Sequence, residues 1–436
     1  MKKITITITI LFAAVIAVTA QTATTTFTAS GITVIYKPTQ KQIINVSVYF
    51  RGGVSNYPAS KAGIENLAIA SVSECGTAKY SKDAFKDKAD SYGIAVYGSA
   101  GRDNALIGLN CISQYFNTGW DLLAQAVTTP TFEETEFNKL KQKIISGIKQ
   151  SASSPDARLS DMAMQNAFAA TPYAINPTGT EETAGGIKAA EAKDYYYNTL
   201  LNKARMFIVV VGNISKADIT AKIAAAFAAV PLKPYQAEAL QLPLFKGNTV
   251  NIEERQLATN YITGIMNGPA YTSADYVPYR LAFASLSEKL FTEIRTKRNL
   301  SYAPQAYARG GAIPYSAVYV TTTNPKAAVE VMANEIDSLK TLGFTEKDLK
   351  NSKALFITSN YMKDESTNAI AASLGTAETL GNWKIAESLP VIINNTTQTQ
   401  MTNAFRKYIT GIKWNYLGVK KQADEAVGAF NIPVAQ

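Results

Sequence analysis

The order of predicted helices and strands is repeated once along the chain, and this repetition limits the fold more than any other feature. Residues 43–49 and 260–266 are each predicted to form a strand, because their apolar and polar residues alternate. Near the end of each half a helix precedes a strand, over residues 189–211 and again over 398–417. Ordered recurrence at a spacing of roughly 200 residues predicts that an α+β unit has been duplicated.

The predicted fold class is α+β, with two homologous αβ-roll halves joined by a linker in a clamshell-like arrangement. Each half would pack helices on an antiparallel-rich sheet. Residues 233–250 have little periodicity and contain two prolines, so they are the predicted linker. The first half then comprises residues 21–232 and the second half comprises residues 251–436.

Residues 1–20 have the features of a secretory signal peptide. Lys2 and Lys3 supply the positive start, residues 4–18 are mostly apolar, and small residues end the segment at Ala20. No other segment approaches the length of a transmembrane helix. The sequence therefore predicts an exported, periplasmic protein without a transmembrane span.

Histidine is absent from all 436 residues. Its absence excludes Ser-His-Asp and Cys-His catalysis, zinc sites with histidine ligands, and an imidazole general base. The chain has 43 basic and 34 acidic residues, but the basic ones are scattered rather than gathered in a stripe. We therefore expect no nucleic-acid partner.

Cys75 and Cys111 are the two cysteines. In an oxidising compartment they could form one disulfide. They could equally be unpaired core residues, since a free cysteine behaves as a small hydrophobic side chain.

Several short motifs occur in the order seen in pitrilysin/insulinase-type zinc peptidases. These are Arg-Gly-Gly at 51–53, Gly-Ile at 63–64, Glu-Cys-Gly-Thr at 74–77, and a Leu-Phe…Arg…Leu-Ser-Tyr pattern over 290–302. The chain resembles that family over residues 25–425. The resemblance implies two αβ-roll halves and an inverted His-x-x-Glu-His zinc motif on the first long helix.

The zinc motif itself is missing. Counted from Gly63, the family's His, Glu and His positions hold Asn66, Ile69 and Ala70. Counted back from Gly76, they hold Leu67, Ala70 and Ser71 instead. Neither alignment supplies a metal ligand or a general base.

The family's third zinc ligand, a glutamate on a later helix, corresponds to Gly147. A catalytic zinc needs three protein ligands and a carboxylate that accepts a proton from the bound water. The resemblance therefore implies a non-catalytic member that binds neither a metal nor another cofactor, with zinc expected only in a partner chain.

The sequence offers no convincing alternative to the lost zinc site. Glu65 and Glu74 are nine residues apart on one predicted helix, so they point in opposite directions. Ser146 and Lys149 match a serine–lysine spacing but are more simply explained as exposed helical residues. The Tyr-Gly-Ser-Ala-Gly segment at 97–101 lacks the first glycine of a nucleophile elbow.

Arg295 and Tyr302 fall within the family-like pattern of the second half. Arg295 lies near the end of a predicted helix, 279–298, and Tyr302 near the start of a predicted strand, 301–308. In the family such a pair binds the substrate backbone and stabilises the oxyanion across a closed chamber. Arginine offers fixed donors and tyrosine a rotatable hydroxyl, which suits that task.

The loss of the zinc motif together with the retained Arg295 and Tyr302 is compatible with two functions. The first is an exported, non-catalytic partner subunit of a two-chain zinc peptidase, which forms half of the peptide-binding chamber and supplies Arg295 and Tyr302. Its partner would be a homologous zinc-bearing chain in a heterodimer. The alternative is a scaffold or peptide-binding holdase without a role in proteolysis, which could be a homodimer that captures peptides by strand addition at residues 97–107.

Overall fold

A computed structural model describes residues 23–433, so the predicted signal peptide at 1–20 lies outside the described residues. The N-terminal half contains β1 (Thr25–Ala29), β2 (Ile32–Pro38), β3 (Ile43–Arg51), α2 (Ile64–Glu74), α3 (Lys82–Ser91), β4 (Ala95–Ala100), β5 (Asn104–Ile112), α4 (Phe116–Thr128), α5 (Glu134–Ser153), α6 (Pro155–Ala167), α7 (Glu181–Gly186), α8 (Ala189–Tyr195), the π-helical turn η5 (Tyr196–Leu200), β6 (Met206–Gly212) and α9 (Lys216–Ala226).

The C-terminal half follows an extended linker. It contains β7 (Thr249–Glu254), β8 (Asn260–Asn267), α10 (Tyr276–Leu290), the π-helical turn η7 (Phe291–Thr296), β9 (Gln305–Arg309), β10 (Tyr315–Thr322), α11 (Pro325–Leu342), α12 (Glu346–Asp364), α13 (Thr367–Thr379), α14 (Lys384–Asn395), α15 (Gln398–Tyr408), β11 (Lys413–Gly418) and α16 (Lys420–Phe430).

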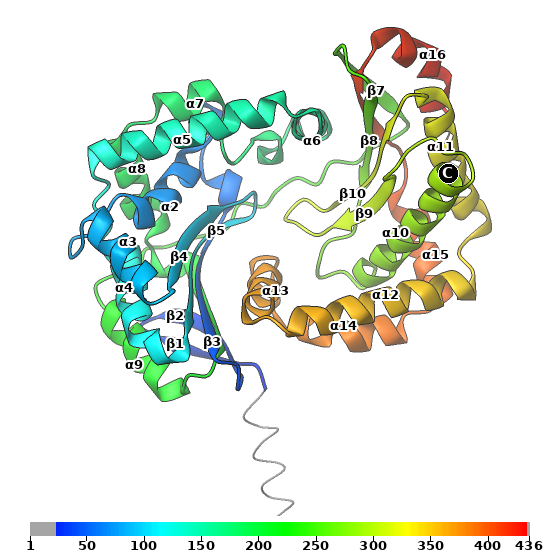
Figure 1. Ribbon diagram of the computed structural model, residues 1–436. Helices are drawn as coiled ribbons and strands as arrows, with labels where there is room; N and C mark the ends of the chain where they lie inside the picture. The colour runs from blue at the N-terminus through cyan, green and yellow to red at the C-terminus, as the bar shows by residue number, and fades with distance from the viewer. Residues whose placement is uncertain (1–22, 434–436) are drawn as a thin grey trace, which may run out of the picture.

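The strands of the described residues form one sheet in each half, as Figure 1 shows. The first sheet has the order β1-β2-β6-β3-β5-β4 and the second has the order β7-β11-β8-β10-β9. Apart from β1, the two orders correspond strand for strand. The directions correspond too, because β2–β6 and β7–β11 are the parallel pairs and the other pairs are antiparallel. The predicted duplication and fold class are confirmed.

Each half places one helix against the sheet of the other half. Helix α13 packs on β3 and β6, where Tyr49 and Phe207 belong to the hydrophobic core of the C-terminal half. The contact is close, since a Cβ atom on Gly375 would lie 2.1 Å from the Tyr49 ring. In return, α6 packs on β8 and β11, where Leu159 contacts the cluster that includes Leu417.

Polar contacts reinforce this reciprocal packing. Arg51 Nη2 lies 2.6 Å from the Glu378 carboxylate, and Asn104 donates to Thr379 at 3.0 Å. On the other side, Arg158 Nε donates to Glu253 at 2.9 Å. Partly buried ion pairs are costly unless they are well bonded, so they favour one relative placement of the halves over others.

Some predicted boundaries differ from the structure. β7 begins at Thr249, inside the predicted linker 233–250. The predicted helix 279–298 begins at Tyr276 and ends as a π-helical turn at Thr296, and the predicted strand 301–308 is β9, which begins at Gln305. Within residues 23–433, every helix is too short or too polar to cross a bilayer.

Candidate functional site

Helix α2 carries the positions that correspond to the family's zinc motif. It begins after Gly63, whose positive φ of 94° suits glycine. Asn66 and Ala70 lie one turn apart on a partly exposed face, whereas Ile69 is buried. The alternative alignment would use Leu67 and Ser71, both of which are fully buried. The alignment counted from Gly63 therefore matches the open face of the helix.

The side chains at this face do not fit a zinc ion. Asn66 offers a neutral amide, Ala70 a methyl group, and Gly147 on α5 has no side chain, with open space where a Cβ would stand. Among the residues that the structure describes, no group of three Cys, Asp or Glu side chains is placed to hold a metal. Zinc prefers thiolate, imidazole or carboxylate ligands, so the face of α2 that carries Asn66 and Ala70 lacks the required donors.

We expect the purified chain to retain no stoichiometric zinc after dialysis, because no ligand set converges on α2. Elemental analysis of the full-length chain measures this directly. Weak, substoichiometric metal on exposed carboxylates would be compatible with the prediction. One tightly held zinc per chain would contradict it.

Arg295 and Tyr302 are brought together in the C-terminal half. The Arg295 guanidinium lies 4.0 Å from the centre of the Tyr302 ring and 4.9 Å from that of Phe291. Tyr302 is 77% exposed, and it lies in the loop before β9 rather than in a strand. Among residues 23–433, no carboxylate lies within 4.0 Å of Arg295.

The backbone beneath this stacked pair is held in place. Arg295 belongs to η7, and the chain turns back so that Leu300 N–H donates to the Ile294 carbonyl at 2.9 Å. Ile294 and Ser301, which precede Arg295 and Tyr302 directly in the chain, are buried and anchor this segment in the core. A guanidinium stacked on an aromatic ring keeps the N–H donors in its own plane free for another partner.

The pair and the α2 face lie in different halves of the chain, as Figure 1 shows for α2 and for α10, which leads into η7. No hydrogen bond or ion pair within residues 23–433 joins Arg295 or Tyr302 to α2. The candidate site is therefore two separate surfaces rather than one assembled centre.

Glu65 is a buried carboxyl that the sequence did not identify as important. Its Oε2 accepts hydrogen bonds from Asn56 at 2.9 Å and from Tyr195 at 2.6 Å. Burial raises the pKa of Glu65 to about 7, although these bonds and the charge of Arg205 lower it. Glu74, in contrast, pairs with Lys86 at the surface, so the expected divergence of the two glutamates is confirmed.

The other candidate motifs form no catalytic pair. Ser146 Oγ donates to the Gln142 carbonyl, and Lys149 pairs with Glu181 at 2.7 Å. Residues 97–100 belong to strand β4 rather than to a strand-to-helix elbow. Cys75 and Cys111 are both buried and free, so the unpaired alternative holds, and burial raises the pKa of each thiol to about 11.

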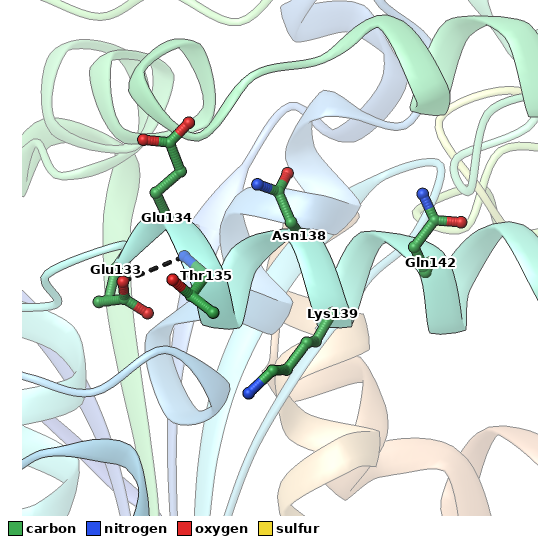
Figure 2. A pocket seen from close by; sticks show the side chains of 6 residues that line it. All are labelled: Glu133, Glu134, Thr135, Asn138, Lys139 and Gln142. Atoms are coloured by element: carbon green, nitrogen blue, oxygen red, sulfur yellow. Dashed lines mark hydrogen bonds between the residues drawn. The ribbon is translucent and has the colours of Figure 1, made fainter.

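A surface pocket lies along the first turns of α5 (Figure 2). All six residues that line it lie between 133 and 142, and Figure 2 shows Glu134 and Lys139 on opposite sides of the helix. Glu133 is occupied as the N-cap and accepts from the Glu136 N–H at 2.8 Å. Since the side chains do not converge, this pocket is an exposed helix face.

Known proteins resemble the chain in both sequence and fold. A Bacillus subtilis protein named "Uncharacterized zinc protease YmxG" is 23% identical over 346 residues, which are 77% of this chain and 83% of that protein. A Helicobacter pylori protein named "Non-peptidase homolog YmxG" is 26% identical over 178 residues, which are 41% of this chain and 40% of that protein.

Solved structures share the fold. A peptidase M16 inactive domain from Pseudomonas fluorescens superposes with a TM-score of 0.82 at 20% identity, over 91% of this chain and 98% of that one. The periplasmic protease PqqL from Escherichia coli gives a TM-score of 0.75 at 14% identity, over 91% of this chain but 46% of its own.

Two family descriptions match adjoining parts of the chain. Residues 33–181 match "Insulinase (Peptidase family M16)" and residues 187–356 match "Peptidase M16 inactive domain". The second match begins within the N-terminal half, because it includes β6 of the first sheet, and continues through β7, β8, β9 and β10 of the second. The chain belongs to the insulinase family of peptidases, family M16.

Proposed function

We propose that the chain is the non-catalytic partner subunit of a two-chain zinc peptidase and does not cleave peptides by itself. It would form half of a peptide-binding chamber and present Arg295 and Tyr302 to a substrate held at the partner's zinc. The zinc-bearing partner would be a homologous chain in a heterodimer.

The observation that carries this proposal is the stacked pair of Arg295 and Tyr302. The arginine has no carboxylate partner within 4.0 Å among residues 23–433, and the tyrosine is largely exposed. A solvent-facing guanidinium and a phenol hydroxyl at one point are suited to bind a peptide carbonyl or an oxyanion. The α2 face of the same chain offers no ligand for the metal that would act beside them.

The relatives support a subunit that works with another chain. The chain spans 46% of PqqL, so a second chain of similar length would be needed to match the whole of that protein. One relative is named a zinc protease and another a non-peptidase homolog, so both kinds of chain occur among its relatives. The features of residues 1–20 and the periplasmic description of PqqL support export to the periplasm.

Reconstitution tests the proposal. The chain is co-expressed with the zinc-motif homologue of the same organism, and peptide cleavage is measured for each chain alone and for the isolated complex. Cleavage is expected from the complex and not from this chain. Cleavage by this chain alone, or a zinc homologue that is fully active without it, would contradict the proposal.

Peptide binding without proteolysis remains the second candidate, and one observation favours it. β4 lies at the edge of the first sheet, so one side of its backbone can pair with an added strand. The predicted edge segment 97–107 was too long, because β5 lies inside the sheet between β3 and β4. Protection of an unfolded protein by the chain alone, without cleavage in any mixture, would favour this candidate.

A further inference from the structure

A pocket of about 260 Å³ lies where the two halves and the linker meet. It is lined by the end of β3, the β4–β5 turn, the residues before β6, the linker segment 235–240, the β9–β10 turn and the end of α13. Three arginines line it: Arg51, Arg102 and Arg205. Because liquid water occupies about 30 Å³ per molecule, the pocket has room for a small ligand as well as solvent.

One of these arginines is already neutralised. Arg51 donates to the Glu378 carboxylate at 2.6 Å and to the Glu378 carbonyl at 3.0 Å, and its guanidinium lies over the Phe207 ring. It therefore links the two halves rather than offering charge to a ligand.

Arg205 is fixed in position without a direct ion pair among residues 23–433, although its charge partly offsets the burial that raises the pKa of Glu65. Its Nη1 donates to the Arg51 carbonyl at 3.0 Å and to Asn56 Oδ1, and its guanidinium lies 4.1 Å from the centre of the Tyr235 ring. No carboxylate within residues 23–433 approaches Arg205 to within 4.0 Å. Its remaining N–H groups are thus available along the edge of a rigid, stacked plane.

Arg102 likewise forms no direct ion pair among residues 23–433, although its charge partly offsets the burial that raises the pKa of the neighbouring Asp103. Its Nε donates to the Tyr173 carbonyl at 3.1 Å, and no carboxylate in the described part of the chain lies within 4.0 Å. Two guanidinium groups whose direct hydrogen-bond partners are neutral line one pocket. Such groups match a pair of oxygens on a carboxylate or a phosphate, which arginine binds through paired N–H donors.

Two buried polar groups near the pocket, which do not line it, lack hydrogen-bond partners in the part of the chain that the structure describes. Asn56, which holds Arg205, itself donates to the buried carboxyl of Glu65. Glu65 Oε1 and the Tyr57 hydroxyl are both buried without a hydrogen-bond partner among residues 23–433. Unpartnered buried polar atoms of this kind are usually satisfied by water or a ligand.

Two carboxylates also line the pocket and affect its charge. Asp103 accepts hydrogen bonds from the Tyr173 hydroxyl and, at 3.0 Å, from the Ala312 N–H. Its carboxylate is therefore already hydrogen-bonded to the residues that surround the pocket. Glu238 lies on the exposed linker segment and has no ion pair in the described residues. Glu238 can therefore compete with an external anion for the arginines.

We infer that this junction pocket binds a small oxyanion, a carboxylate or a phosphate, between Arg102 and Arg205. The pocket is lined by residues from both halves and the linker, so a bound ligand would stabilise their packing against one another. The inference does not depend on the proposed peptidase partnership, because it concerns the isolated chain.

Isothermal titration of the full mature chain tests the inference with three probes: inorganic phosphate, N-acetyl-trialanine, and the amide of that peptide. We expect saturable binding of phosphate, of the peptide acid, or of both, and no binding of the amide. The variants R102Q and R205K should each weaken the affinity roughly ten- to hundredfold, the usual effect of losing a charge-assisted hydrogen bond.

Two further variants complete the design. E238Q should strengthen binding several-fold by removing the competing carboxylate, whereas R298Q, an exposed arginine paired with Glu293 outside the pocket, should leave binding unchanged. If R205K fails to fold, R102Q decides the test, since its guanidinium makes a single hydrogen bond within residues 23–433. The inference is overturned if none of the probes binds, or if binding survives R102Q unchanged.

Discussion

Replacement of Arg295 by alanine is expected to lower peptide turnover by the reconstituted two-chain enzyme by about 10²–10³-fold, the usual cost of losing one oxyanion donor. The guanidinium lies on the Tyr302 ring with its in-plane donors free, so the substitution removes those donors and also releases the tyrosine. Arg295 is partly exposed and has no ion pair within residues 23–433, so folding should change little.

Tyr302→Phe separates the two contributions of this pair. The phenylalanine ring keeps the stacking surface for Arg295 and removes the hydroxyl alone. A fall in kcat with unchanged KM would indicate that the hydroxyl acts in the transition state, whereas a rise in KM alone would indicate substrate positioning.

Arg298→Ala is the matched control, because Arg298 is an exposed arginine three residues away that pairs with Glu293. Turnover is measured on a labelled peptide at equal assembly, checked by size exclusion. If both Arg295→Ala and Tyr302→Phe retain full activity, the chain contributes no functional group to the partner's site and the scaffold function is favoured.

The duplicated fold was predictable because its central strands can be read locally. β6 is an apolar run of residues that are all buried, and β11 has the same place in the second half. β7 was missed because it is an edge strand whose residues are only half-buried. Helix α13 was not predicted, because glycine disfavours the interior of a helix and Gly375 lies in its middle. The reason for a glycine at this position is the Tyr49 ring, which packs directly against it.

The candidate site was predictable in part. The sequence placed Arg295 and Tyr302 near each other through a family-like pattern, but the stacking depends on a π-helical turn and a returning loop that no local pattern indicates. Glu65 was considered only as a metal ligand together with Glu74, and nothing in the sequence indicated that its carboxyl is buried. Its burial depends on Tyr195, which lies 130 residues further along the chain.

Burial of Glu65 should make the folded chain less stable as the pH rises. Its pKa is raised from 4.5 to about 7, chiefly because burial disfavours the charged form. The folded chain therefore keeps its proton to a higher pH than the unfolded chain does. The resulting contribution to the free energy of unfolding is complete below about pH 4.5 and is lost as the pH rises through about 7. This change in pKa corresponds to about 3 kcal/mol of unfolding free energy, since one pKa unit is about 1.4 kcal/mol.

Glu65→Gln should remove this dependence, because glutamine has the same shape, accepts the bonds from Asn56 and Tyr195, and does not ionise. The variant is expected to match or fall slightly below the wild type at pH 4.5 and to exceed it by up to about 3 kcal/mol above pH 8. Urea unfolding of both proteins across this range gives the difference directly. Glu74→Gln, on the same helix but paired with Lys86 at the surface, is the control and should show no such rise. A constant difference between Glu65→Gln and the wild type at all pH values would mean that Glu65 ionises normally in the folded chain.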